Sequence, residues 1–309
     1  MERPETKARF FIEEHPENLG GEPRHQVLTR ILKAETCQFL ADRGWGVAIA
    51  MIQLDEPTAR LIKDINQRFP NLPVSAWTVV DDKDGYWTTK FNVSQTRDKV
   101  EEVKVWADRF DLDFEAIGLD LEPPIEVTRG FMTKGLIGLI KPWRETNRKY
   151  REQQQSGYNP EEEMRDVLDQ LKKEGITTHS YEMPFPLNVP SLGVLQVVDF
   201  DTRVTMVYST WDLPRLIESK IPTVCLKQDT YPAIGVYSST GRVPGRSLGL
   251  FDKSAINREV LEQDINTLSK KAGSRGDGFP KNLWVFALDD IRIAQWTGQA
   301  LKRLSYSKP

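Results

Sequence analysis

Short apolar segments recur eight times along this chain, and stretches with helical spacing separate them. The apolar segments lie at 8–12, 46–54, 72–80, 114–121, 177–183, 203–209, 233–239 and 283–288. The intervening stretches, such as 25–44, 56–70, 94–110, 212–220 and 257–273, carry apolar residues every three to four positions. Because strand and helix alternate along the whole chain, we expect a parallel sheet. Eight such units in 309 residues favour a closed (β/α)8 barrel of the TIM type over an open sheet.

The whole chain, 1–309, is expected to form one barrel domain, since 309 residues with 39% hydrophobic content can bury a single large core. The regular alternation breaks between 130 and 175. That segment is too long for one barrel helix and is interrupted by SGYNP at 156–160. We therefore predict a charged helical hairpin inserted after the fourth strand, at 143–165.

Composition excludes several classes of function. The net charge of -3 comes from mixed acidic and basic residues without a long basic block, so no nucleic-acid partner is expected. No apolar run is long enough to cross a bilayer, so we expect a soluble protein without membrane insertion. The N-terminus has no apolar leader segment, which makes the cytoplasm the default compartment and secretion after leader removal the alternative.

Cofactor and metal motifs are also missing from the sequence. No Gly-x-Gly-x-x-Gly follows the first strand, which argues against the simplest dinucleotide site. The two cysteines, Cys37 and Cys225, lie in no C-x-x-C pattern, and the three histidines form no H-x-H or H-E-x-x-H. We therefore expect no cofactor, no structural metal and no disulfide framework.

The segment FEAIGLDLEPP, 114–124, ends an apolar strand with two carboxylates. Residues two apart on a strand share a face, so Asp120 and Glu122 are expected to point into the barrel together with Gly118. Catalytic residues of such barrels gather at the C-terminal strand ends. Two crowded carboxylates oppose each other's ionisation, so one can keep its proton near neutral pH and act as a general acid.

Other acidic residues and several aromatic residues also lie near the ends of predicted strands. Asp55, Glu56 and Asp212 follow strands directly before helices, and we interpret them as helix N-caps. Several aromatic residues also fall near the predicted mouth of the barrel, where their rings offer apolar platforms for a ligand. The candidate platforms are Trp77, Trp87, Tyr181, Trp211 and Tyr237.

FEAIGLDLEPP resembles the fourth-strand signature F-D-G-I-D-L-D-W-E-Y-P of family 18 glycoside hydrolases, the chitinases and endo-β-N-acetylglucosaminidases. The matching residues are Phe114, Ile117, Leu119, Asp120, Glu122 and Pro124. VDFDTRVTMVYST resembles the family's sixth strand with M-x-Y-D, and FALDD resembles its final W-A-L-D. The chain departs from the pattern at Glu115, Gly118, Ser209 and Phe286, where the family has Asp, Asp, Asp and Trp.

The resemblance implies a chitinase-like reaction on an oligosaccharide or polysaccharide. Glu122 would protonate the glycosidic oxygen, and Asp120 would orient the substrate's acetamido group as it attacks the anomeric carbon. Tyr208 would donate a hydrogen bond to the acetamido carbonyl, and Phe286 would take the place of the tryptophan under the sugar.

Two alternatives stay open. Glu182 ends the fifth predicted strand and could act as the second carboxylate of a retaining or inverting glycosidase, flanking the same bond as Glu122. Alternatively, the lost carboxylates indicate a catalytically silent glycan-binding barrel. The sugar, the linkage and the oligomeric state are not indicated by the sequence.

Overall fold

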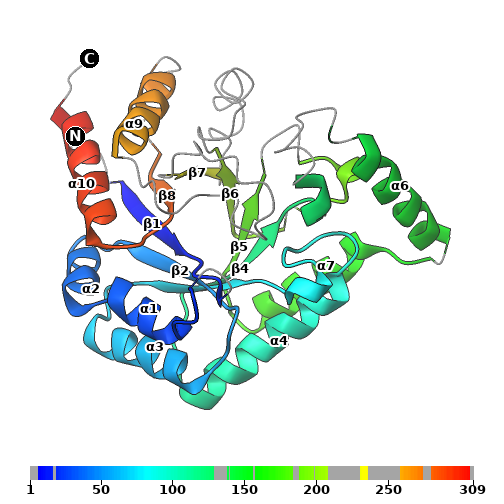
Figure 1. Ribbon diagram of the computed structural model, residues 1–309, viewed down its shortest axis with the longest axis horizontal. Helices are drawn as coiled ribbons and strands as arrows, with labels where there is room; N and C mark the ends of the chain where they lie inside the picture. Colours follow the sequence, from blue (N-terminus) through cyan, green and yellow to red (C-terminus); the bar gives the residue numbers. More distant parts are fainter. Residues whose placement is uncertain are drawn as a thin grey trace. The chain divides into compact units, whose positions relative to one another are not determined.

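The computed structural model describes residues 6–16, 19–128, 138, 140–155, 157–183, 188–197, 199–207, 230–235, 258–273 and 280–306. Eight strands close in chain order into a barrel (Figure 1). They are β1 Lys7–Ile12, β2 Gly46–Ala50, β3 Val74–Thr78, β4 Ala116–Leu121, β5 Thr178–Glu182, β6 Thr202–Met206, β7 Thr230–Gly235 and β8 Asn282–Phe286. Each overlaps one of the eight apolar segments, so the predicted (β/α)8 fold is confirmed.

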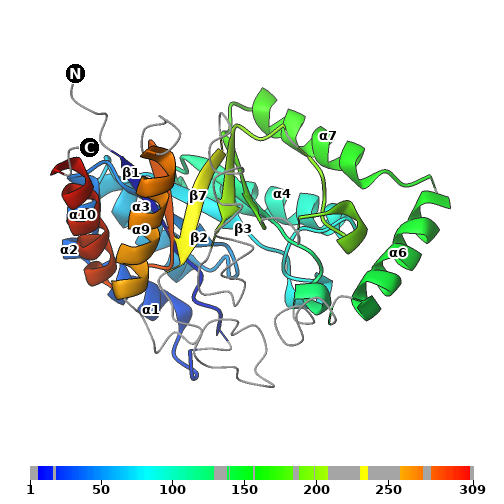
Figure 2. The same cartoon turned by 90° about the horizontal axis from the view of Figure 1, so that it is seen from above.

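By internal contacts the chain divides into two compact units. The first unit comprises Met1–Ala50, Asp55–Val74 and Met206–Pro309. Its helices are α1 Arg24–Ile31, α2 Ala34–Ala41, α3 Glu56–Arg68, α9 Arg258–Gly273 and α10 Ile291–Tyr306. In this unit α9 and α10 pack side by side (Figures 1 and 2).

Local sequence explains where the helices of the first unit begin. Asp55 caps α3 as predicted, because its side chain accepts a hydrogen bond of 2.8 Å from the backbone of Thr58. Glu56 instead lies in the first turn of α3, and Asp212 falls outside the described residues. The stretch 25–44, which has helical spacing throughout, forms two helices, because Lys33 adopts an extended backbone between them.

Cys37 lies on α2 and is fully buried. Burial raises the pKa of its thiol to about 12, so the group stays protonated and is no candidate nucleophile.

The second unit comprises Met51–Leu54 and Ser75–Thr205. It contains α4 Val93–Phe110 and, between β4 and β5, the two helices α6 Ile140–Gln155 and α7 Pro160–Lys173. Helix α6 ends at Gln155 and α7 begins at Pro160, in agreement with the predicted interruption: the Asn159 side chain caps α7, and Pro160 occupies its first turn. Ion pairs of 2.7 Å between Lys104 and Glu174 and of 2.9 Å between Arg97 and Glu163 join α4 to α7.

None of the helices that the structure describes is both long and apolar enough to cross a membrane.

Candidate functional site

The candidate site is built on β3, β4 and β5 of the second unit. These strands are parallel, with Trp77 opposite Gly118, Gly118 opposite His179, and Asp120 opposite Tyr181. Residues in register on neighbouring strands point to the same face, and residues two apart on one strand do so as well. Asp120 therefore shares a face with Gly118, Trp77, His179 and Tyr181.

The contact between Trp77 and Tyr181 identifies this face as the concave interior. Their strands are separated by β4 and lie about 9.5 Å apart. The two rings nevertheless meet edge to face with centroids 6.0 Å apart. Side chains from alternate strands converge in this way only on the inside of a curved sheet. Both rings are buried, with 4% of Trp77 and 1% of Tyr181 exposed.

Gly118 leaves room for the Tyr181 ring. A Cβ atom at position 118 would lie 2.5 Å from Cε2 and 2.6 Å from Cζ of Tyr181. The side chain of Tyr181 thus fills the space that a carboxylate at position 118 would need. Where family 18 has an aspartate, this chain therefore has Gly118, and the Tyr181 ring of the neighbouring strand occupies the space of the missing side chain.

Replacing Gly118 with Ala is expected to destabilise the protein by about 1 to 3 kcal/mol, because the added methyl group must displace a buried ring. Urea unfolding of the variant measures this change. The matched control is Gly298→Ala on α10, where a Cβ atom meets nothing nearer than 3.4 Å and the helix gains about 0.5 to 1 kcal/mol. A Gly118→Ala protein as stable as the control would show that Tyr181 does not constrain position 118.

The two carboxylates lie at the C-terminal end of β4. Asp120 is 2% exposed and Glu122, the next residue of the same parity, is 4% exposed. The chain after β3 runs along this strand end, since the Thr88 amide donates a 2.8 Å hydrogen bond to the Asp120 carbonyl and Thr88 aligns with Leu121 as a parallel bridge. Asp120 and Glu122 thus sit in a water-poor position on a fixed piece of backbone.

Glu182 lies on the opposite face of the sheet. It is in register with Leu121 and shares its parity with Ser180, whose hydroxyl donates a 2.6 Å hydrogen bond to Oε1. Arg203 of β6 binds both carboxylate oxygens, with Nε 2.8 Å from Oε1 and Nη2 2.6 Å from Oε2. Hydrogen bonding to Glu182 raises the pKa of Arg203 above its ordinary value. The structure does not bring Glu182 together with Asp120.

Trp87 lies in the compact loop between β3 and α4. Only 5% of its surface is exposed, and its ring packs edge to face on Tyr86 with centroids 6.0 Å apart. The Asn92 side chain fixes this loop by donating hydrogen bonds to the carbonyls of Trp87 and Asp84. Trp87 is therefore a buried part of the loop in this structure and not an open platform.

Phe286 belongs to the first unit and is buried with 5% exposed. It packs on Phe11 with ring centroids 6.2 Å apart, and Phe11 also contacts Trp284 at 5.1 Å. The remaining candidates, Tyr208, Trp211 and Tyr237, lie outside the described residues.

Lys90 is a buried cation that the sequence did not reveal. Its side chain is 3% exposed, and Nζ lies 2.6 Å from Oε1 of Glu161 in the first turn of α7. The same ammonium group lies 4.3 Å from the ring centre of Tyr150 on α6, and the Lys90 amide donates to the Gly193 carbonyl. Lys90 therefore connects the loop after β3 to both helices of the hairpin. Nothing local in TTKFNV signals this role, because the partners are remote in sequence.

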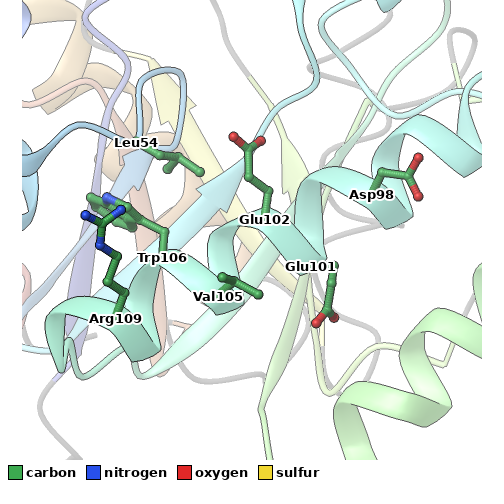
Figure 3. Close-up of a pocket in the computed structure, with 7 residues that line it drawn as sticks. All are labelled: Leu54, Asp98, Glu101, Glu102, Val105, Trp106 and Arg109. Carbon is green, nitrogen blue, oxygen red and sulfur yellow. The ribbon is translucent and has the colours of Figure 1, made fainter.

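A groove of about 490 Å³ lies on the outer surface of α4 (Figure 3). Figure 3 shows Glu101 and Glu102 pointing in different directions, and their carboxylates pair with Lys104 and Lys99 at 2.8 Å. The groove is lined by Leu54, Asp98, Glu101, Glu102, Val105, Trp106 and Arg109. Its residues come from a helix and a loop and not from strand ends, and they form no arrangement of nucleophile, acid and base.

Within the described ranges, no three His, Cys, Asp or Glu side chains are grouped closely enough to hold a metal ion.

Comparison with known proteins shows the fold and no family. No protein-family model matches the sequence. No curated protein matches it either. Among solved structures, a GH113 β-1,4-mannanase aligns over 100% of both chains with 14% identity and a TM-score of 0.50. The spore cortex-lytic enzyme SleL of Bacillus megaterium QM B1551 aligns over 96% of this chain and 73% of its own, with 8% identity and a TM-score of 0.50. A D-tagatose 3-epimerase-like protein aligns over 97% of both chains at 12% identity and a TM-score of 0.47. At these identities the likeness to the mannanase and to SleL supports the barrel fold alone and leaves the activity open.

Proposed function

We propose that the protein is a glycoside hydrolase whose reaction takes place at the C-terminal end of β4. The observation that carries this proposal is the presence of two buried carboxylates, Asp120 and Glu122, 2% and 4% exposed, at the strand end where barrel enzymes place their catalytic groups. Trp77 and Tyr181 lie on the same face as Asp120 and form a buried aromatic pair beside it.

In the proposed reaction Glu122 donates a proton to the glycosidic oxygen as the bond to the anomeric carbon breaks. The carbonyl oxygen of the substrate's acetamido group attacks that carbon, while Asp120 holds the acetamido N–H and stabilises its developing positive charge. Tyr208 hydrogen-bonds the acetamido oxygen. Glu122, now a carboxylate, then takes a proton from the water that opens the cyclic intermediate, which regenerates the acid.

The origin of the nucleophile can be tested with Asp120→Asn and a panel of substrates. We expect cleavage of glycans that contain N-acetylglucosamine, none of mannan or cellulose, and inhibition by a thiazoline mimic of the cyclic intermediate. Asp120→Asn should lower kcat by about 100-fold or more, because the amide cannot balance the intermediate's positive charge. Hydrolysis of glycans without acetamido groups, unaffected by the thiazoline, would refute substrate assistance.

The second candidate is a glycan-binding barrel without catalysis. The Tyr181 ring fills the space beside Gly118, and this favours the second candidate. In family 18 glycoside hydrolases an aspartate at this position shares a proton with the counterpart of Asp120, and here that aspartate would have no room. This candidate predicts that glycans bind without being cleaved and that Glu122→Gln leaves their affinity unchanged.

A further inference from the structure

Helix α6 exposes two large apolar side chains on one face. Ile140 is 51% exposed and Trp143, one turn later, is 44% exposed. In the part of the chain that the structure describes, only Val105 is a further large apolar side chain with comparable exposure. Residues three apart on a helix are surface neighbours, so Ile140 and Trp143 form one small apolar patch.

The charge of α6 differs from that of the whole chain. The helix IKPWRETNRKYREQQQ carries five basic and two acidic residues, whereas the protein has a net charge of -3. Lys141 and Arg148 form ion pairs within the helix with Glu145 at 4.0 Å and Glu152 at 2.8 Å. Arg144, beside Trp143, and Arg151 form no ion pair with any residue described by the structure, and both are exposed. Among the described residues, the two arginines beside the patch therefore have no acidic partner.

Helix α6 also packs on loops that follow barrel strands; Thr146 is buried, and Asn147, one turn after Trp143 on the side of the patch, lies at the border of this contact. The Asn147 side chain donates a 3.2 Å hydrogen bond to the Ser191 carbonyl in the loop after β5. Lys149 lies 6.0 Å from the ring centre of Phe91, in the loop after β3. These loops leave the C-terminal ends of their strands, as do Asp120 and Glu122, so α6 belongs to the same end of the second unit. In Figures 1 and 2, α6 is the outermost of the helices α4, α6 and α7.

We propose that this surface of α6, formed by Ile140, Lys141, Trp143, Arg144 and Arg151, binds an anionic polysaccharide. The indole of Trp143 stacks on a sugar face, and the guanidinium groups pair with carboxylates along the polymer. This inference rests on the proposed glycosidase function and gives its substrate class as an acidic glycan chain, held outside the Glu122 site. The positive charge of the helix favours an acidic polymer, because a neutral glycan has no carboxylates with which Arg144 and Arg151 can form ion pairs.

A lipid surface suits this helix less well. Membrane-bound amphipathic helices present a wide apolar face, whereas α6 exposes only two large apolar side chains and is otherwise polar. A binding test with an acidic polysaccharide and with lipid vesicles distinguishes these two ligands.

The test measures binding of hyaluronan oligosaccharides, of a neutral cellulose derivative of the same length, and of phosphatidylserine vesicles to the full chain. We expect binding of hyaluronan alone, weakened by salt. Trp143→Ala and Arg144→Ala should each weaken this binding by about tenfold, as for a central contact worth about 1.4 kcal/mol. The matched controls are Val105→Ala and Arg109→Ala, exposed residues of α4, and these should bind as the unaltered protein does. Circular dichroism checks that each variant is folded.

The outcomes separate this inference from the proposed function. Cleavage of short neutral glycans without α6-dependent binding of hyaluronan would overturn the inference and leave the glycosidase in place. Binding that depends on Trp143 and Arg144 in a protein that cleaves no glycan would support the surface while refuting the enzyme. Equal binding of the neutral polymer, or binding of vesicles in place of hyaluronan, would overturn the inference.

Discussion

Replacement of Glu122 by Gln is expected to lower kcat for glycan hydrolysis by roughly 100- to 10,000-fold, the usual contribution of a general acid. The amide keeps the shape of the side chain, but its N–H groups are too weakly acidic to protonate the leaving oxygen. Because Glu122 is 4% exposed, a neutral amide in its place also avoids burying a charge, so the fold should persist. The measurement is steady-state hydrolysis of a chromogenic glycoside, with thermal unfolding as the check on folding.

Glu182→Gln is the matched control for this experiment. Glu182 ends the neighbouring strand and is similarly buried, with 5% exposed, but it faces Arg203 on the other side of the sheet. Its replacement should lower the melting temperature, because it removes half of a bidentate ion pair, and should change kcat by less than about threefold. If Glu182→Gln abolished turnover while Glu122→Gln preserved it, the catalytic roles proposed for β4 would be wrong.

Replacement of Lys90 by Met is expected to lower the free energy of unfolding by about 3 kcal/mol. Removing one partner of a buried ion pair costs about 3 to 5 kcal/mol, because the remaining charge loses its compensation. The lower end of that range applies, since 17% of the Glu161 side chain remains exposed to water. Urea unfolding gives the value, and the double variant Lys90→Met and Glu161→Leu should recover most of it.

Lys33→Met provides the comparison for Lys90. Lys33 pairs with Glu35 at 3.0 Å, but the two side chains are 50% and 65% exposed. Exposed pairs contribute at most about 1 kcal/mol, so this variant should unfold almost as the unaltered protein does. An equally small effect at Lys90 would mean that the loop after β3 is held by its backbone contacts and not by the ion pair.

The barrel could be predicted because its signals are local. The apolar run at 114–121, for example, predicts a strand by itself, and the order of strands and helices then restricts the topology. The helical spacing of 25–44 did not reveal the break between α1 and α2, because the periodicity continues across Lys33 although the backbone there is extended. Periodicity describes which side chains face the core and does not show where two short helices meet.

The site was less accessible to sequence reasoning, because it depends on register between strands. The sequence makes Tyr181 a candidate platform and Glu182 a candidate second carboxylate of the same site, yet adjacent residues of a strand point to opposite faces. The register shows that Tyr181 is the one beside Asp120. The sequence shows Gly118 only as a missing carboxylate, whereas the structure shows that the Tyr181 ring on β5 occupies the space beside it. The ion pair between Lys90 and Glu161 could not be predicted either, because it joins segments that are far apart in the sequence.

The fit between Gly118 and Tyr181 also restricts the mutational routes open to this protein. A single change that introduces a carboxylate at 118 meets the ring, and a single change that shrinks Tyr181 leaves a buried cavity, at a cost of about 3 to 5 kcal/mol. Either single mutant would lose a large part of the free energy of unfolding, which is ordinarily about 5 to 15 kcal/mol. Positions 118 and 181 are therefore expected to change together among descendants of one ancestor, and an engineer who restores the acid at 118 must first replace the tyrosine.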